Sequence, residues 1–249
     1  MINPISSLSG FFRKRTEPTE QQKNVKIIFV HGFGGEDKTG KTQKMIQEQL
    51  QDLDLDNCIT AVTYAWDSIH YSLFNIKNDW GRAKENAEKE IEPFLKFLKK
   101  ETGDGQQQVY IIAFSLGTRI VAHAINKLNP FPKNLKGIFF WGSALTESFR
   151  LNQSVPIKIL NYYSKNSDFI LNELYRFIES NHPGGWYGFY EIAGFVNHHT
   201  AASHAIPRVN YKSRLIRPTI QIIAFWEGFI KVSEISEYDI AEARLDRRR

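Results

Sequence analysis

A serine flanked by small residues is the first feature of the chain that indicates chemistry. Residues 113–117 read AFSLG, which is the G-x-S-x-G nucleophile elbow with alanine in the first position. The elbow needs small residues two positions before and after the serine, because a strand and a helix approach closely around a strained turn that presents the hydroxyl. The spacing predicts that Ser115 attacks a carbonyl carbon as a nucleophile, with a purely structural turn as the alternative.

A glycine-rich loop is the second chemical feature. The segment HGFGG at residues 31–35 directly follows an apolar run at residues 25–30. Acyl transfer needs two backbone N–H donors that converge on the developing oxyanion. One usually comes from such a loop and the other from the residue after the nucleophile. The N–H groups of Phe33 and Leu116 are the predicted oxyanion donors, and His31 is expected to fix the loop by hydrogen bonding rather than to act as a base.

Apolar patterns indicate the elements that must position these groups. Short apolar runs predict buried strands at residues 25–30, 59–66, 109–114, 135–141 and 157–163. Apolar residues spaced three and four apart predict helices at residues 43–53, 80–98 and 116–128, with Pro93 bending or interrupting the second. Strands that alternate with helices pair in parallel through right-handed crossovers. We therefore predict an α/β fold, a three-layer α/β/α sandwich with a mainly parallel sheet.

The chain beyond residue 168 has weaker patterns. Residues 169–178 look helical, and residues 187–196 are the best candidate for a last strand. The strongly apolar residues 215–232 predict a closing helix that is entered near Pro218.

Four segments together resemble the α/β-hydrolase superfamily, in its serine-hydrolase form. They are IIFVHGFGG around the glycine-rich loop, TYAWD at residues 63–67, YIIAFSLGTR at the serine turn and IKILNYYSKNSDFIL at residues 157–171. The resemblance covers about residues 25–171 and is greatest to a poorly characterised branch. It implies the α/β-hydrolase fold, a Ser, Asp, His order along the chain and hydrolysis of an ester, thioester or amide. An esterase- or lipase-like enzyme without a metal or organic cofactor is the expectation.

The nucleophile would need a histidine to take its proton and a carboxylate to orient that histidine. Asp168 follows the strand predicted at residues 157–163, where the resemblance places the acid; a helix cap is a compatible reading. The implied order leaves four downstream histidines, of which His182 precedes a proline in a turn. His198 and His199 are consecutive, so at most one would face the serine. His204 lies before the closing helix, where the superfamily has its histidine, and is the first choice; His199 is the second.

A rival motif overlaps the glycine-rich loop. Residues 35–42 match G-x-x-x-x-G-K-[ST], the phosphate loop of nucleotide hydrolases, with Gly35 first and Thr42 last. In that motif the first glycine follows its strand almost at once, whereas here residues 31–34 intervene. The later strands also lack a convincing magnesium-binding aspartate at their ends. A nucleotide-binding protein therefore remains the second hypothesis.

A third hypothesis keeps the fold without catalysis. The domain would then serve as a non-catalytic binding scaffold, and the serine turn would be only structural. An acid and a base that converge on Ser115 would distinguish the enzyme from the scaffold.

Composition excludes several classes of protein. With 42% hydrophobic and 24% charged residues in 249 positions, the chain is an ordinary globular protein rather than a disordered or fibrous one. A single cysteine, Cys58, excludes sites built on several thiolates. The net charge of +5 owes much to four arginines among the last six residues, so we expect no nucleic-acid partner.

The expected organisation is a flexible leader at residues 1–24, one hydrolase domain at residues 25–235 and a charged tail at residues 236–249. No apolar run reaches the 18 or so residues of a membrane-spanning helix, and the first residues do not read as a signal peptide. We therefore expect a cytoplasmic protein with a small-molecule or lipid acyl substrate. The sequence leaves the oligomeric state open.

Overall fold

The computed structural model describes most of the region predicted to fold. The two ends of the chain, which include the expected leader and charged tail, lie outside the described residues, as does most of the segment between the glycine-rich loop and the first helix. The described ranges are 24–34, 40–68, 75–103, 105–152, 155–157, 159–165, 168–179, 181–190, 194–204 and 210–235.

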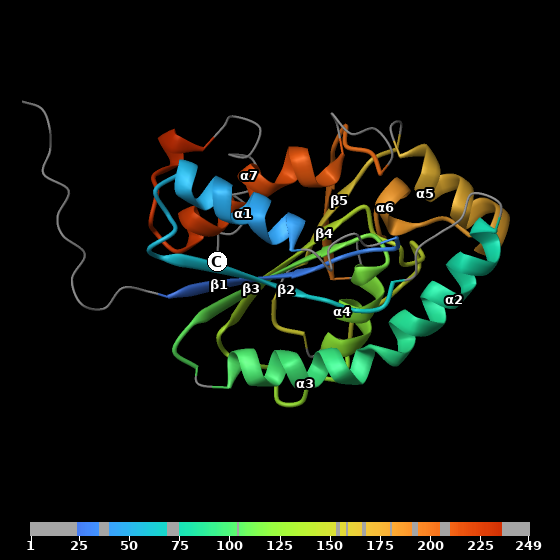
Figure 1. Ribbon diagram of the computed structural model, residues 1–249, viewed down its shortest axis with the longest axis horizontal. Coiled ribbons are helices and arrows are strands. Elements are labelled where there is room, and N and C mark those ends of the chain that lie inside the picture. Colours follow the sequence, from blue (N-terminus) through green and yellow to red (C-terminus); the bar gives the residue numbers. More distant parts are fainter. Residues whose placement is uncertain are drawn as a thin grey trace, which may run out of the picture.

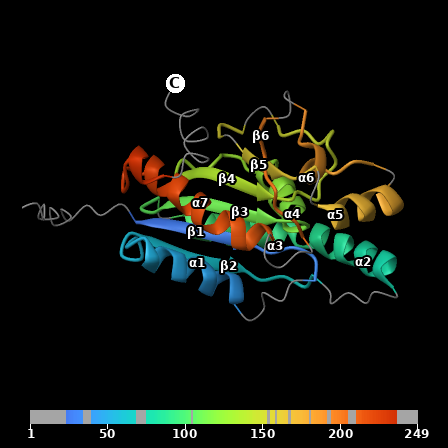
Figure 2. The same cartoon turned by 90° about the horizontal axis from the view of Figure 1, so that it is seen from above.

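In the described ranges, six strands form one sheet in which every pair is parallel. Their order across the sheet is β2-β1-β3-β4-β5-β6, and Figure 2 shows them side by side. The strands predicted before residue 164 are all present, so the expected parallel sheet is confirmed. Their bounds are β1 Val25–Val30, β2 Ile59–Tyr64, β3 Gln108–Phe114, β4 Leu135–Trp141, β5 Ile159–Tyr163 and β6 Phe195–His199.

Helices cover both faces of the sheet, which confirms the three-layer sandwich (Figure 1). Helices α1 (Lys41–Asp52) and α7 (Tyr211–Trp226) lie on one face; α2 (Ile76–Lys89), α3 (Ile91–Thr102) and α4 (Gly117–Ile125) lie on the other. Successive side chains of a strand point to opposite faces. Ile28 and Val30 accordingly pack with α2 to α4, whereas Ile27 and Phe29 pack with α1 and α7.

Short helical segments join β5 to β6. They are α5 (Phe169–Leu174), a π-helical stretch (Tyr175–Glu179) and α6 (Gly184–Tyr187). The last strand predicted at residues 187–196 is therefore wrong, because it overlaps α6 and only the first two residues of β6. Gly188 and Gly194 have φ values of +84° and +83°, which a regular strand does not adopt. Phe189 and Tyr190, which follow Gly188, are not part of a strand, and residues 191–193 lie outside the described residues.

The closing helix also differs from its prediction. It begins at Tyr211, where the side chain of Asn210 accepts a hydrogen bond from the Ser213 N–H at 2.7 Å, and Pro218 lies inside it. It ends at Trp226, two residues before Gly228 (φ +80°). No helix in the described ranges is both long enough and apolar enough to cross a membrane.

Pro93 does mark an interruption, as expected. The helical pattern at residues 80–98 is divided at Glu90, which ends α2 and precedes α3. Pro93 then lies in the first turn of α3, where N–H groups have no acceptor within the helix and a proline removes no helical hydrogen bond.

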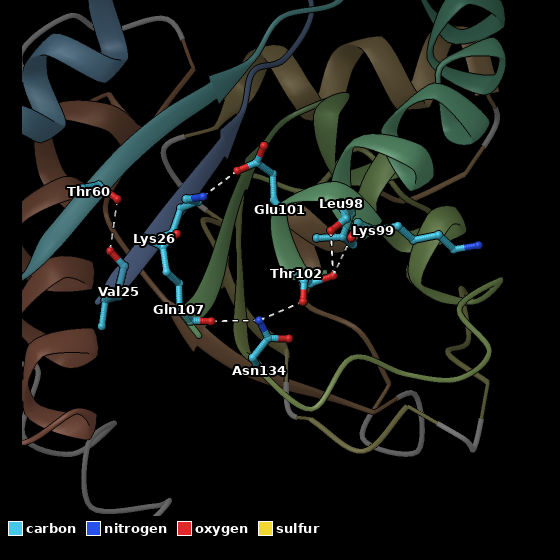
Figure 3. A network of polar contacts seen from close by, with 9 residues as sticks. All are labelled: Val25, Lys26, Thr60, Leu98, Lys99, Glu101, Thr102, Gln107 and Asn134. Atoms are coloured by element: carbon cyan, nitrogen blue, oxygen red, sulfur yellow. Dashed lines mark hydrogen bonds and ion pairs between the residues drawn. The ribbon is translucent and has the colours of Figure 1, made fainter. Parts of the chain in front are cut away.

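The two ends of the sheet have different roles. At the amino ends of the strands, Asn134 donates to the carbonyl oxygens of Thr102 and Gln107 at 3.2 and 2.9 Å, and Lys26 pairs with Glu101 at 2.7 Å (Figure 3). These contacts attach the end of α3 to the sheet. At the carboxyl ends, the chain leaves β1 toward β2 and later returns to β3 on the other side of β1. Loops diverge at such a switch point and leave a crevice between them.

Candidate active site

Ser115 lies at this switch point, in the turn between β3 and α4. Its φ of +52° is unusual for a residue with a side chain, and such a conformation persists only where the surroundings enforce it. Its N–H donates to the Trp141 carbonyl at 2.9 Å. Its carbonyl oxygen accepts from the N–H and hydroxyl of Thr118, at 3.0 and 2.6 Å, and from the Ala144 N–H at 3.3 Å. These bonds hold the strained turn that the nucleophile pattern predicts.

Two glycines bring the loop after β1 directly against this turn. A Cβ atom on Gly32 would lie 2.5 Å from the Cβ of Ser115, and one on Gly117 would lie 2.4 Å from the carbonyl oxygen of His31. The backbone that leads to Phe33 therefore passes beside the serine. The Leu116 N–H belongs to the start of α4, where N–H groups have no acceptor within the helix. The role of the Phe33 and Leu116 N–H groups as oxyanion donors stays a prediction.

His31 anchors the loop through both ring nitrogens, and it is fully buried. Nδ1 donates to the Gly32 carbonyl at 3.1 Å, and Nε2 accepts from the Trp66 N–H at 3.2 Å. The indole N–H of Trp66 donates in turn to the His31 carbonyl at 2.8 Å, and the two rings stack. Both ring nitrogens of His31 therefore have hydrogen-bond partners within the loop and its neighbour Trp66. The contacts agree with the expected loop-fixing role rather than with a general base.

The structure brings Asp168 and His204 together from loops 36 residues apart. Nδ1 of His204 lies 2.6 Å from Oδ2 of Asp168, and the His204 N–H donates to Oδ1 at 3.4 Å. Asp168 is fully buried after β5. The second-choice histidine, His199, is exposed at the end of β6 against Tyr163. Of the two candidates, His204 has the carboxylate partner.

The imidazole of His204 lies against residues on either side of the serine. It stacks on Phe114, with ring centroids 4.8 Å apart and 24° between the planes. A Cβ atom on Gly142 would lie 2.5 Å from the Cε1 atom of His204. Gly142 follows Trp141, whose carbonyl is bonded to Ser115. Nε2 of His204 is buried and has no hydrogen-bond partner among the described residues. Within the part of the chain that the structure describes, this nitrogen is therefore left for another partner, and its ring packs beside the serine turn.

A buried tyrosine completes the surroundings of the pair and was missed by sequence reasoning. Tyr211 is the first residue of α7; its ring meets the imidazole of His204, and its hydroxyl lies near the Asp168 carboxylate. Burial, together with the charge of Asp168, raises the pKa of Tyr211 well above its usual value. The asparagine cap before Tyr211 was the one local signal that a helix begins here. Nothing in the sequence shows that this ring lies beside residues 168 and 204.

Burial of two tyrosines predicts a loss of stability in alkali. Burial raises the pKa of Tyr175 as well as that of Tyr211. Their contribution to stability is complete below the unfolded-state pKa of about 10 and is lost as the pH rises toward the folded-state value. Urea unfolding should therefore give a free energy that falls above about pH 10, and less steeply in Tyr175→Phe. An identical slope in that variant would contradict the assignment.

The described geometry disfavours nucleotide binding by the phosphate-loop motif at residues 35–42. Residues 35–39 lie outside the described residues, but Gly40 precedes α1 and the side chain of Thr42 is fully buried. A magnesium-binding hydroxyl would have to face the phosphates. The backbone just before this motif, at Gly32, is packed against Ser115. Apart from this motif, no group of three or more histidine, cysteine or acidic side chains that could hold a metal ion occurs among the described residues.

Comparisons with known proteins agree with this geometry at the level of family and fold. A family model described as "Alpha/beta hydrolase of unknown function (DUF900)" matches residues 12–142, more than half of the chain. That match includes Ser115 and the loop after β1 but ends before Asp168 and His204. No curated protein matches the chain.

Solved structures share the fold at low sequence identity. The protein TT1662 from Thermus thermophilus is 9% identical with a TM-score of 0.50, over 83% of this chain and 90% of that chain. The esterase PE8 is 15% identical with a TM-score of 0.49, over 84% of this chain and 94% of that chain. Likeness at this level concerns the arrangement of the elements alone.

Proposed function

Because this chain belongs to the family of α/β hydrolases of unknown function, and has a histidine and a buried carboxylate beside its serine turn, we propose that it is a serine hydrolase. The single observation that carries the proposal is the 2.6 Å contact between Asp168 and His204. Among the described residues, Nε2 of the same imidazole has no hydrogen-bond partner, and the ring lies next to the turn that contains Ser115. A binding scaffold has no need of a fully buried carboxylate paired with a histidine at that position.

The proposed reaction has two halves. The Ser115 hydroxyl oxygen attacks the carbonyl carbon while Nε2 of His204 accepts its proton, and Asp168 stabilises the imidazolium that forms. The tetrahedral intermediate collapses as His204 protonates the leaving group, which departs and leaves an acyl-enzyme. Water then attacks the acyl-enzyme, with His204 again acting first as base and then as acid.

The Phe33 and Leu116 N–H groups are the proposed donors to the negative oxygen of each tetrahedral intermediate. Support comes from Gly32, which has no side chain to keep the loop away from Ser115. The loss of one such donor typically costs about 3–4 kcal/mol in the chemical step. The substrate class that this chemistry serves is an ester, thioester or amide, and we propose a carboxylic ester as the first substrate to assay.

Labelling with a fluorophosphonate probe tests the proposal. Such a probe phosphonylates only an activated serine, so we expect wild-type protein to be labelled on Ser115 and Ser115→Ala to remain unlabelled. Ser148→Ala, at an exposed serine outside the turn, should be labelled like the wild type. The position of the adduct can be read by peptide mass spectrometry.

The other two hypotheses predict different results. An unlabelled wild-type protein that binds magnesium-ATP, and loses that binding in Lys41→Ala, would replace the hydrolase with the nucleotide-binding protein. An unlabelled protein that does not bind magnesium-ATP would favour the scaffold. Label that persists in Ser115→Ala would overturn the assignment of the nucleophile.

A further inference from the structure

Tyr211 occupies the centre of the residues that surround the acid and the base. The residue is fully buried. Its ring meets the imidazole of His204 edge to face, with centroids 5.2 Å apart and 67° between the planes, and it also contacts Phe114 at 5.9 Å. A Cβ atom on Gly142 would lie 2.8 Å from the Cε2 atom of Tyr211. Phe114, Gly142 and Tyr211 thus confine the imidazole from three directions.

The hydroxyl of Tyr211 lies near Asp168, the acid of the pair. It lies close enough to the Asp168 carboxylate for that charge to act on it, and it donates a long hydrogen bond to the Gly185 carbonyl at 3.5 Å. A fully buried carboxylate is stable in its charged form only when donors surround it. Burial and the nearby negative charge raise the pKa of Tyr211, so its hydroxyl keeps its proton and remains a donor at neutral pH.

We propose that Tyr211 is a positioning residue for the Asp168–His204 pair, an inference that rests on the proposed hydrolase function. The hydroxyl holds the carboxylate in the orientation that accepts the Nδ1–H of His204. The ring prevents the imidazole from turning away from Phe114. Together these contacts keep Nε2 at the serine turn before substrate arrives. Catalysis by such a pair depends on orientation of this kind, because the base must lie within hydrogen-bond reach of the nucleophile.

The chain offers a matched control for the loss of a buried phenol hydroxyl. Tyr110 is also buried, and its hydroxyl donates to a carboxylate, Glu227, at 2.7 Å. It lies on β3 at a distance of five residues from Ser115, and packs against Trp226 rather than against the pair. Tyr110→Phe therefore removes a similar bond without touching Asp168 or His204.

The test compares Tyr211→Phe with Tyr110→Phe in two measurements. The first is the rate of fluorophosphonate labelling, with kcat and KM for a p-nitrophenyl ester. We expect Tyr211→Phe to lower the labelling rate and kcat about 10- to 100-fold with KM unchanged, as for loss of a hydrogen bond to a charged group. Tyr110→Phe should match the wild type in both. The second measurement is the low-field proton NMR signal of the His204 Nδ1–H, which should shift or broaden only in Tyr211→Phe.

The outcomes separate this inference from the proposed function. Wild-type labelling on Ser115 with equal rates in both phenylalanine variants would overturn the role of Tyr211 and leave the hydrolase standing. An equal loss of rate in both variants would mean general destabilisation and would also overturn it. If the wild type is not labelled, the hydrolase proposal fails, and the NMR signal still decides whether Tyr211 positions the pair. An unchanged NMR signal in Tyr211→Phe would reject the positioning role of Tyr211.

Discussion

Ser115→Ala and His204→Ala should each lower kcat/KM for an activated ester by about 10⁴- to 10⁶-fold. The double variant should lose no more activity than the less active of the two single variants. The reason is that the two side chains act as one unit. A hydroxyl without its base is a poor nucleophile, and a base without its hydroxyl has nothing to activate. The measurement is kcat/KM for the two single variants and the double variant, with the fold of each checked by circular dichroism.

Two further variants sharpen this experiment. Asp168→Asn should cost on the order of 10⁴-fold, because an amide facing Nδ1 favours the wrong tautomer of His204. His182→Ala removes an exposed histidine, whose ring packs against Trp186 and Tyr187, and should leave the activity unchanged. Losses that add in the double variant would mean that Ser115 and His204 work independently, contrary to the mechanism.

Gly117→Ala should destabilise the protein by about 3 kcal/mol or more, the second large effect expected. The new Cβ would lie 2.4 Å from the His31 carbonyl oxygen and 2.6 Å from that of Val30. Val30 is the last residue of β1, a strand paired on both sides, and the His31 carbonyl accepts a hydrogen bond from the Trp66 indole, so neither neighbour can move without breaking these contacts. Overpacking of a rigid core costs about 1–3 kcal/mol and occasionally more. Urea unfolding measures the change in the free energy of unfolding.

Gly81→Ala is the matched control for this substitution. Gly81 lies in α2, and a Cβ atom there would meet nothing within 4 Å. Alanine is favoured over glycine inside a helix, so this variant should be more stable than the wild type by about 0.5–1 kcal/mol. Similar changes in the free energy of unfolding of the two variants would show that close packing against β1 is not the reason why residue 117 must be glycine.

The close contacts at Gly117 also explain why the nucleophile-elbow pattern requires small residues. Ala113 and Gly117 are small because β1, β3 and α4 meet around Ser115, and that requirement is visible in five consecutive residues. The buried strands are visible for a similar reason. A strand covered on both faces needs an unbroken apolar run, and the run lies entirely within one segment of the chain. Local chemistry of this kind predicted the parallel sheet and the position of the serine turn.

The last strand shows where local patterns stop being sufficient. Residues 184–187 form α6 because the N–H groups of Gly184 and Gly185 donate to the carbonyls of Leu145 and Ser143, at 2.8 and 2.9 Å. These partners are about 40 residues away, so no window of sequence contains both halves of the interaction. The aromatic residues that follow have the composition of a strand, but Gly188 has a positive φ and the described residues Phe189 and Tyr190 are not in a strand.

The amino-acid sequence by itself determined the first five strands, the helices between them and the turn that contains Ser115, since each depends on side-chain size and polarity within a short segment. Only the tertiary structure decided that His204, rather than His199, meets Asp168, and that Tyr211 lies against both. Those contacts join three separate loops and helix ends at the carboxyl edge of the sheet. Their geometry follows from how β5, β6 and α7 pack, which spacing along the chain does not encode.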